Sequence, residues 1–308
     1  MVEHDLPKVK IRVRFPLPAH NMLKEEIVEN IKNSKKYKTI YIKTIERIVA
    51  DCIERFGEKR AEKEAKNLLH QIWGAFYETR PNFKKVISKL DIENLEQLST
   101  SKENLKEFII PILKLQSSVE ERISILPESY KKIFEITGIP NSIIDHACGL
   151  NPLTIPWMNL PTSQQGGPNT TSYKAYDIDS EEIEFLKTVF SKIHCATKTE
   201  FALGDVLSDE FKYADVVFML KLLPCLEHQK KGCSLDILKK QNCKFIVISY
   251  PIKSIGGKEK GMYEFYRNNF KNMISSEDLA LRSFGEAGWK VTELLFETEL
   301  VFVIEKPI

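Results

Sequence analysis

The sequence predicts an α/β fold, in which a doubly wound and mostly parallel sheet follows a helical N-terminal region. From residue 142 onward, short apolar runs alternate with segments of helical character, at the spacing of consecutive βαβ units. The last two apolar runs are separated only by Phe296–Glu299, a link too short for a parallel crossover. The final strand must therefore run antiparallel to its neighbour.

The alternation defines seven strands, predicted at 142–146, 172–178, 198–204, 214–220, 244–250, 289–295 and 299–305. Helices are expected between them at about 180–193, 228–240 and 262–287. Seven strands with an antiparallel last one is the architecture of Rossmann-like, S-adenosylmethionine-dependent methyltransferases rather than of dehydrogenases. Residues 101–308 are therefore predicted to form one such domain.

Aspartates stand at the ends of three successive predicted strands. Asp145 closes the first strand and leads into a tight turn at Gly149. Asp177 closes the second strand, and Asp205 follows the third. Ligands of open α/β sheets bind at these strand ends, where a glycine lets the backbone approach them. Asp177 suits a ribose diol and Asp205 an adenine amino group. Each aspartate could instead cap a helix, but three at successive ends favour a ligand site.

A dinucleotide site is less consistent with the same turn. The G-x-G-x-x-G pattern is absent, because Asn151 and Pro152 stand where further glycines would be. A pyrophosphate needs close backbone contact, which these residues hinder. The zwitterionic methionine moiety of S-adenosylmethionine does not need it.

Further candidate groups lie near the predicted strand ends. Lys221 follows the fourth strand, and the loop after the fifth holds Lys253, Lys258 and Lys260. A basic loop over an active site suits a phosphate-backbone substrate. Tyr250, at the end of the fifth strand, could stack on an extruded base.

Arg122 is the only arginine between Arg80 and Arg267. It closes Ser117–Arg122, where two serines precede acidic residues in the manner of a helix start. An arginine entering a nucleotide-type cleft could hold a carboxylate bidentately. A surface position is the alternative.

Residues 22–100 are predicted to form a small helical domain with a basic exterior. One apolar helical stripe comprises Ile45, Ile48, Val49, Cys52, Ile53 and Phe56, and a second comprises Ala65, Leu68, Leu69, Ile72, Trp73 and Phe76. Outside the stripes lie Lys32, Lys35, Lys36, Lys38, Lys43, Arg47, Arg55, Lys59, Arg60, Lys63 and Lys66. Residues 1–90 hold 20 Lys+Arg against 12 Asp+Glu, whereas the whole chain has a net charge of +2. This asymmetry suggests a polyanionic partner, although a solvated lysine-rich face would look the same.

The N-terminal segment, the cysteines and the absence of targeting signals limit the class of protein further. In residues 1–21, positions 8–15 alternate between cationic and apolar residues, as in an edge strand docked on the body or an arm laid along phosphates. We expect a disordered or merely docked extension, since terminal segments are often loose. The six cysteines show no framework spacing, which suits a reducing cytoplasm. We find no secretory signal and no run of 18 apolar residues. Cys225, His228 and Cys233 have a loosely metal-like spacing, but no C-x-x-C pair accompanies them, so no metal is expected.

Taken together, these stretches resemble the aminoglycoside-resistance 16S ribosomal RNA (guanine-N7) methyltransferases, which occur in antibiotic producers and as acquired determinants in pathogens. The resemblance covers roughly nine tenths of the chain and rests on six motifs in order, Leu69–Tyr77, Ser117–Arg122, Asp145–Pro152, Tyr176–Asp179, Leu220–Glu227 and Ser249–Met262. The chain departs from the pattern in residues 1–21. His146 also stands where a leucine is more usual, and Tyr250 where a phenylalanine is.

The resemblance implies S-adenosylmethionine as methyl donor and S-adenosylhomocysteine as product. Arg122 would hold the methionine carboxylate, Asp177 the ribose hydroxyls and Asp205 the adenine. The implied cofactor-binding residues are Arg122, Asp145, Ala147, Gly149, Asp177, Ile178, Asp205, Val206 and Leu220. Lys221 and Glu227 would act at the methyl-transfer site.

The implied partner is the 30S ribosomal subunit with its 16S rRNA, bound by a cytoplasmic, monomeric protein. The expected RNA contacts are Lys35, Lys36, Arg60, Lys66, Tyr250, Lys253, Lys258 and Lys260. Two alternatives stay open. One is an adenine-N1 methyltransferase acting at the same site, and the other is a non-catalytic ribosome-binding protein that retains the donor pocket.

Overall fold

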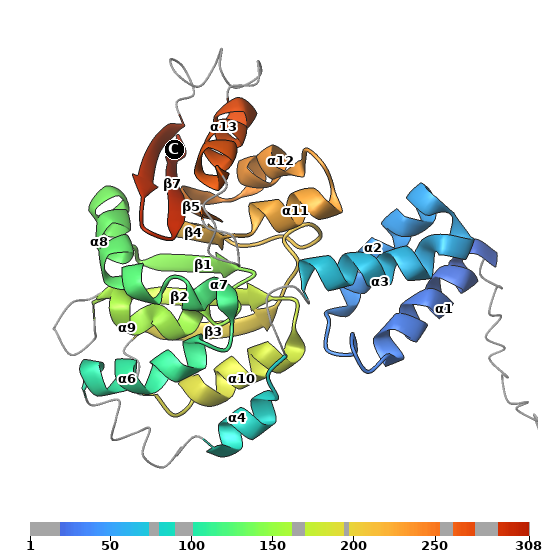
Figure 1. The fold of residues 1–308 in the computed structure, drawn as a ribbon, viewed down its shortest axis with the longest axis horizontal. Helices are drawn as coiled ribbons and strands as arrows, with labels where there is room; N and C mark the ends of the chain where they lie inside the picture. Colours follow the sequence, from blue (N-terminus) through green and yellow to red (C-terminus); the bar gives the residue numbers. More distant parts are fainter. Residues whose placement is uncertain are drawn as a thin grey trace, which may run out of the picture.

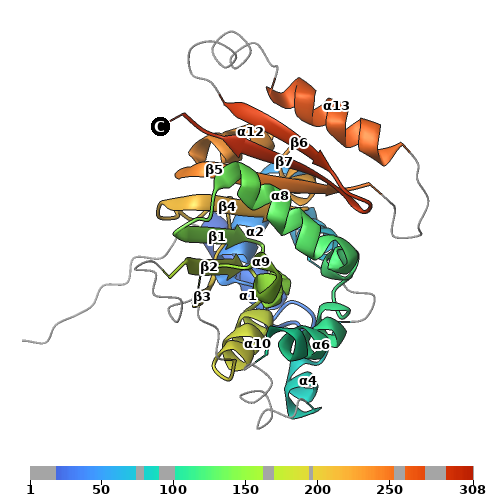
Figure 2. The same cartoon turned by 90° about the vertical axis from the view of Figure 1, so that its left-hand side faces the viewer.

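A seven-stranded mixed sheet forms the centre of the protein (Figures 1 and 2). The computed structural model describes residues 19–73, 80–89, 101–161, 170–193, 197–252, 261–274 and 289–307. The strands are β1 (Ser142–His146), β2 (Ser172–Asp177), β3 (Lys198–Leu203), β4 (Ala214–Leu220), β5 (Cys243–Pro251), β6 (Lys290–Leu295) and β7 (Glu299–Glu305). Each predicted strand is confirmed to within one residue at either end.

The strand order is β3-β2-β1-β4-β5-β7-β6. β1 pairs in parallel with both β2 and β4, so the direction of the strand order reverses at β1. The loops that follow β1 and β4 therefore lead to opposite sides of the sheet. β7 is antiparallel to β5 and to β6, as predicted for the last strand. Its insertion between β5 and β6 was not predicted. This topology opens a crevice at the carboxyl ends of β1 and β4.

Helices cover both faces of the sheet (Figure 2). They are α6 (Lys102–Leu113), α7 (Ser117–Glu120), η2 (Ile123–Ile125), α8 (Leu126–Thr137), η3 (Asn151–Thr154), α9 (Ile155–Met158), α10 (Ser180–Phe190), α11 (Leu223–Gln229), α12 (Cys233–Lys240) and α13 (Met262–Ile274). The helix predicted at 228–240 is in fact two helices and begins earlier, because Gly232 adopts a left-handed φ of 76° between them. Residues 275–287 of the last predicted helix lie outside the described residues.

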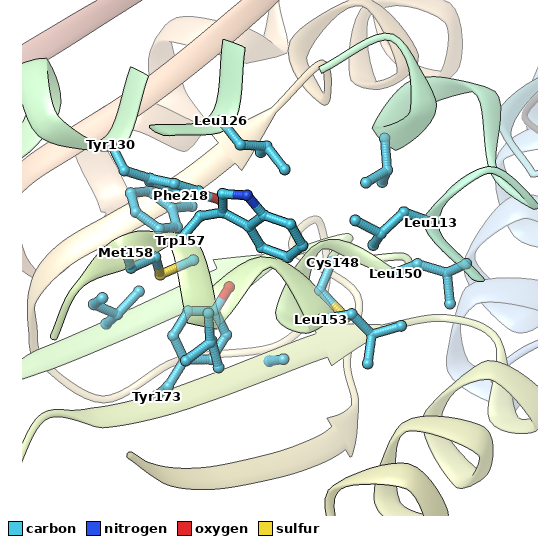
Figure 3. Packing of buried hydrophobic residues seen from close by; sticks show 14 of the residues in the cluster. Leu113, Leu126, Tyr130, Cys148, Leu150, Leu153, Trp157, Met158, Tyr173 and Phe218 are labelled. Atoms are coloured by element: carbon cyan, nitrogen blue, oxygen red, sulfur yellow. The ribbon is translucent and has the colours of Figure 1, made fainter. Parts of the chain in front are cut away.

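The two faces of the sheet are buried in separate apolar clusters. On one face, Trp157 of α9 lies near Leu126 of α8 and Phe218 of β4 (Figure 3). On the other face, Phe270 of α13 stacks on Phe302 of β7 with ring centroids 4.0 Å apart. Burial of both faces explains why β4, β5 and β7 read as nearly continuous apolar runs.

A three-helix unit lies to one side of the sheet (Figure 1). It comprises α1 (Ala19–Asn33), α2 (Ile42–Phe56) and α3 (Glu58–Ile72), and its own core contains the predicted stripe from Ile45 to Ile53. The next helix, α4 (Phe83–Lys89), packs on the sheet domain instead, with Phe83 4.8 Å from Phe185 between ring centroids. We therefore place the boundary before α4 rather than at residue 100.

Among the described helices, none combines the length and the apolar character that crossing a membrane requires. The alternating segment 8–15 lies outside the described residues.

Candidate functional site

An open cavity lies at the carboxyl ends of β1, β2 and β4, and the atom-free space within it, including its open mouth, is about 1040 Å³. All nine residues predicted to bind the cofactor line it, namely Arg122, Asp145, Ala147, Gly149, Asp177, Ile178, Asp205, Val206 and Leu220. Lys221 lines it too. Their assembly follows from the topology, because parallel strands bring residues from distant parts of the sequence to one edge.

Two residues of this cavity have unusual backbone conformations. Among the described residues, three that are not glycine adopt positive φ, and two of them, Ala147 and Lys221, line the cavity with φ of 51° and 55°. Such conformations cost about 1–3 kcal/mol each and cluster at functional sites. The left-handed turn at Lys221 aims its side chain back toward α7.

At the end of β1, Asp145 is almost completely buried in a polar cluster. Its Oδ2 accepts hydrogen bonds from Asn151 Nδ2 at 2.8 Å and from the Tyr173 hydroxyl at 2.6 Å. Burial raises the pKa of Asp145 to about 7, against the lowering effect of these two hydrogen bonds and of the nearby Arg122 guanidinium. Asp145 therefore changes charge near neutral pH.

This raised pKa makes a prediction for stability. Between the ordinary pKa of 3.8 and the folded value of about 7, the folded chain keeps a proton that the unfolded chain has lost. The contribution of Asp145 to the free energy of unfolding therefore falls as pH rises through this window. Relative to Asp145→Asn, the free energy of unfolding of wild type should fall by about 2 kcal/mol between about pH 5 and pH 7. Urea unfolding of both proteins at both pH values measures it, and a difference independent of pH would contradict the prediction.

At the end of β2, Asp177 is held by backbone amides. Its Oδ2 accepts from Gly149 N at 3.0 Å and its Oδ1 from Asp179 N at 3.0 Å. Burial raises the pKa of Asp177 to about 6, although these amides lower it. Each oxygen retains a second lone pair for a hydroxyl donor.

Gly149 is required by both its conformation and its surroundings. Its φ is 50°, and an added Cβ would lie 2.4 Å from Gln116 Oε1. That oxygen accepts a hydrogen bond from Leu150 N at 2.8 Å. Gly149→Ala is therefore expected to disturb the turn and to weaken S-adenosylhomocysteine binding by about tenfold or more. Calorimetric titration tests this, with Gly138→Ala as control, since Gly138 also has positive φ but no neighbour within 4 Å of an added Cβ.

Next to Asp145, and joined to it through Asn151, the cavity wall holds a cluster of buried charges. Arg122 donates from NH1 to Asn151 Oδ1 at 2.7 Å, and its Nε lies 3.2 Å from Glu299 Oε1. Lys221 Nζ contacts Glu121 Oε2 at 2.6 Å, the Ser118 carbonyl at 3.0 Å and Glu299 Oε1 at 3.2 Å. Two cations thus share one carboxylate whose residue is 1% exposed.

Sequence reasoning missed Glu299. It begins β7, and nothing in its local pattern distinguishes it from the other acidic residues of the β6–β7 link. Only the insertion of β7 beside β5 brings it to the cavity end where Arg122 and Lys221 lie.

Glu227, predicted to act at the methyl-transfer site, has a different position. Its carboxylate accepts hydrogen bonds from Gly232 N at 2.6 Å, from Ser234 N at 2.9 Å and from the Ser234 hydroxyl. These bonds lower its pKa even though burial raises it. Glu227 is not among the residues that line the cavity. It holds the turn that starts α12, and a direct catalytic role does not fit this geometry.

The three-helix unit closes the side of the cavity next to β3. Arg47 of α2 donates to Asp205 Oδ2 from Nε at 3.0 Å and from NH2 at 2.7 Å. Thr44, Ile72 and Trp73 of the same unit also line the cavity. From the sequence, Arg47 is expected on the basic exterior of the helical domain, outside the apolar stripes. Its side chain is instead 16% exposed and lies between the two parts of the molecule.

A second contact between the parts is centred on Asp179, just after β2. Its side chain is fully buried and accepts from Trp73 Nε1 at 2.9 Å and from Arg80 NH2 at 2.6 Å. It also caps α10 by accepting from Glu181 N at 3.0 Å. Trp73, the residue after α3, thereby joins the end of that helix to the sheet domain.

The predicted RNA contacts have mixed positions. Lys35, Lys36 and Arg60 are exposed, whereas Lys66 is half-buried and pairs with Glu62 at 2.6 Å. Lys253, Lys258 and Lys260 lie outside the described residues.

Tyr250 does not fit a base-stacking role. It is 6% exposed, stacks on Tyr266 at 4.8 Å between ring centroids and contacts Phe302 edge-on. Its position on β5, whose flanking helix α13 covers it, accounts for this burial.

His146, where the family pattern has a leucine, is accommodated as a neutral core residue. Its Nε2 lies 3.0 Å from Gln241 Oε1 and its ring packs edge-on against Phe211. Burial lowers its pKa to about 4, despite the bond to Gln241. Within the described residues, no group of three or more His, Cys, Asp or Glu side chains is arranged to hold a metal ion.

Comparison with known proteins agrees with this geometry. Residues 33–303 match the family model described as Ribosomal RNA methyltransferase (FmrO). The chain is 31% identical over 288 residues to a 16S rRNA (guanine(1405)-N(7))-methyltransferase of Proteus mirabilis, an alignment that covers 92% of this chain and 97% of that protein. It is 30% identical over 286 residues to a protein of the same name from Micromonospora rosea, with 92% and 96% covered.

Solved structures show the same fold. The 16S rRNA methyltransferase RmtF in complex with S-adenosyl-L-homocysteine has a TM-score of 0.68 at 24% identity, over 92% of this chain and 98% of that chain. The 16S rRNA methylase ArmA has a TM-score of 0.52 at 30% identity, over 74% and 100%. The resemblance inferred from the six motifs is thus confirmed, and the chain belongs to the ribosomal RNA methyltransferase (FmrO) family.

Proposed function

We propose that this protein transfers a methyl group from S-adenosylmethionine to N7 of a guanine in the aminoglycoside-binding decoding site of 16S rRNA, within the 30S subunit. The observation that carries the proposal is the cavity in which all nine predicted cofactor residues meet. Relatives that match nearly the whole chain and carry this activity in their names support the choice of base. We further propose a cytoplasmic monomer that makes the bacterium resistant to aminoglycosides.

The residues of the cavity fit S-adenosylmethionine by their chemistry. The cavity presents the buried Arg122 guanidinium and the Asp177 carboxylate held by backbone amides, and Gly149 lets the backbone approach a ligand. Arg122 would hold the methionine carboxylate, Asp177 the ribose hydroxyls and Asp205 the adenine amino group. When bound, this cofactor supplies an electrophilic methyl group on a sulfonium.

The proposed reaction does not require acid–base catalysis by the protein. Guanine N7 has an exposed lone pair and carries no proton, so no general base is needed. Lys221, whose ammonium is committed to Glu121, Glu299 and the Ser118 carbonyl, acts as a positioning group at the end of β4. Orientation of the two reactants supplies most of the rate. Lys35, Lys36 and Arg60 would contact rRNA phosphates, since the three-helix unit exposes them.

Tritiated methyl transfer into purified 30S subunits tests the proposal, with the modified base mapped by borohydride–aniline cleavage. Cleavage at one decoding-site guanine is the expected result, and Arg122→Ala or Asp205→Ala should abolish it. Arg267→Ala, which removes an arginine paired with Glu293 outside the cavity, should retain cofactor binding. Label without strand scission would instead indicate adenine N1. Cofactor binding with no label at all would indicate a different RNA or a binding-only protein.

A further inference from the structure

The adenine end of the cavity is built by both parts of the molecule. Asp205 Oδ1 accepts from Leu207 N at 2.9 Å, which leaves Oδ2 to face Arg47. Arg47 NH2 also donates to Gln229 Oε1 at 2.7 Å. Arg47, Asp205 and Gln229 all line the cavity, and the latter two residues are 4% and 7% exposed. One arginine of α2, together with the Leu207 amide, therefore fixes the orientation of the Asp205 carboxylate.

We propose that Arg47 is a positioning residue of the donor site, which orients Asp205 for the adenine ring and links cofactor occupancy to the docking of the three-helix unit. The inference rests on the adenine role proposed above for Asp205. Guanidinium–carboxylate bonds are strong and directional, particularly where water is excluded. A carboxylate held in this way accepts from an exocyclic amino group and repels an oxo group at the same position.

A neighbouring ion pair provides a matched comparison. Lys43 lies one turn before Arg47 on α2 and contacts Asp209 Oδ1 at 2.9 Å, in the loop that begins with Asp205. Its side chain is 55% exposed, and it does not line the cavity. Lys43→Ala therefore breaks a contact between the same two segments but removes no contact of the Asp205 carboxylate, and Asp209 Oδ2 still accepts from Asp205 N at 2.9 Å.

The test is calorimetric titration, without RNA, of S-adenosylhomocysteine and of S-inosylhomocysteine, in which an oxo group replaces the 6-amino group. Wild type should prefer the adenosyl compound by at least about tenfold. Arg47→Ala and the milder Arg47→Gln should bind the adenosyl compound about tenfold more weakly than wild type does. Their affinity for the inosyl compound should stay within about twofold of wild type, so the preference for the adenosyl compound is lost. Lys43→Ala should keep the preference. Asp205→Asn should also lose it, and adding Arg47→Ala to Asp205→Asn should change nothing more.

The inosyl compound also reports on folding, because a misfolded variant would lose both ligands. An unchanged preference in Arg47→Ala, or an equal loss of both ligands in Arg47→Ala and Arg47→Gln, would overturn the inference while leaving the proposed function intact. A wild-type chain that binds neither compound would overturn both.

Amide hydrogen exchange tests the link to the three-helix unit. S-adenosylhomocysteine should slow exchange in α2 of wild type and not in Arg47→Ala at saturating ligand. Saturation of wild type without protection of α2 would contradict the linkage.

Discussion

Glu299→Gln is expected to weaken S-adenosylhomocysteine binding and methyl transfer by about 100-fold. The substitution keeps the shape of the side chain but removes the negative charge that lies 3.2 Å from both Arg122 Nε and Lys221 Nζ. Lys221 would then keep only Glu121, whose side chain is 32% exposed, as a paired carboxylate among the described residues, and Arg122 would lose its direct ion pair. Leaving a buried charge uncompensated costs about 3–5 kcal/mol, and about 1.4 kcal/mol corresponds to tenfold.

Glu293→Gln is the matched control for this experiment. Glu293 lies on β6 of the same hairpin and also pairs with an arginine, since Arg267 Nε is 2.9 Å away. Its side chain is 25% exposed and its partner Arg267, unlike Arg122 and Lys221, does not line the cavity. The loss of this charge should therefore cost less than about 1 kcal/mol and leave binding unchanged. Calorimetric titration and urea unfolding of both variants distinguish the cases. If both substitutions weakened binding equally, Glu299 would affect the cofactor site only by stabilising the β6–β7 hairpin.

Asp179→Ala is expected to lower the free energy of unfolding by about 3 kcal/mol. Its buried carboxylate joins Trp73 and Arg80 to the first turn of α10, so the substitution removes a cap and leaves the indole N–H and the guanidinium without this acceptor. Because the contact connects α3 to the sheet domain, the three-helix unit should also become more accessible to protease.

Glu181→Ala serves as the comparison for Asp179. Glu181 pairs with the same Arg80 at 3.2 Å, but its side chain is 37% exposed. An exposed pair of this kind contributes about 0–1 kcal/mol. Urea unfolding followed by circular dichroism measures both variants. An equally large decrease in the free energy of unfolding for Glu181→Ala would indicate that the stabilisation depends on Arg80 and not on the buried Asp179 carboxylate.

The strands and the positions of their terminal aspartates could be read from the sequence. Apolar runs buried on both faces are distinct from amphipathic helices, and the short Phe296–Glu299 link allows only an antiparallel last strand. Since all parallel strands end at one edge of the sheet, Asp145, Asp177 and Asp205 had to lie near one another. Local pattern and one topological rule were enough for this half of the site.

The other half depends on contacts between segments that are distant in the sequence. Arg47 and Lys43 lie on one helix and look alike as basic residues outside an apolar stripe, yet only Arg47 lines the cavity. Glu227 and Glu299 are both glutamates near turns, but one caps α12 and the other holds two buried cations.

The sequence by itself thus determined the fold class, the strands, the edge of the sheet that carries chemistry and the aspartates placed there, but not the position of β7 between β5 and β6. Only the tertiary structure decided which charged residues are solvated, which are paired and which are buried. It also showed that Tyr250 is buried. The physical reason is that hydrophobic periodicity is encoded within a few residues, whereas the environment of a charge is set by whichever element packs against it.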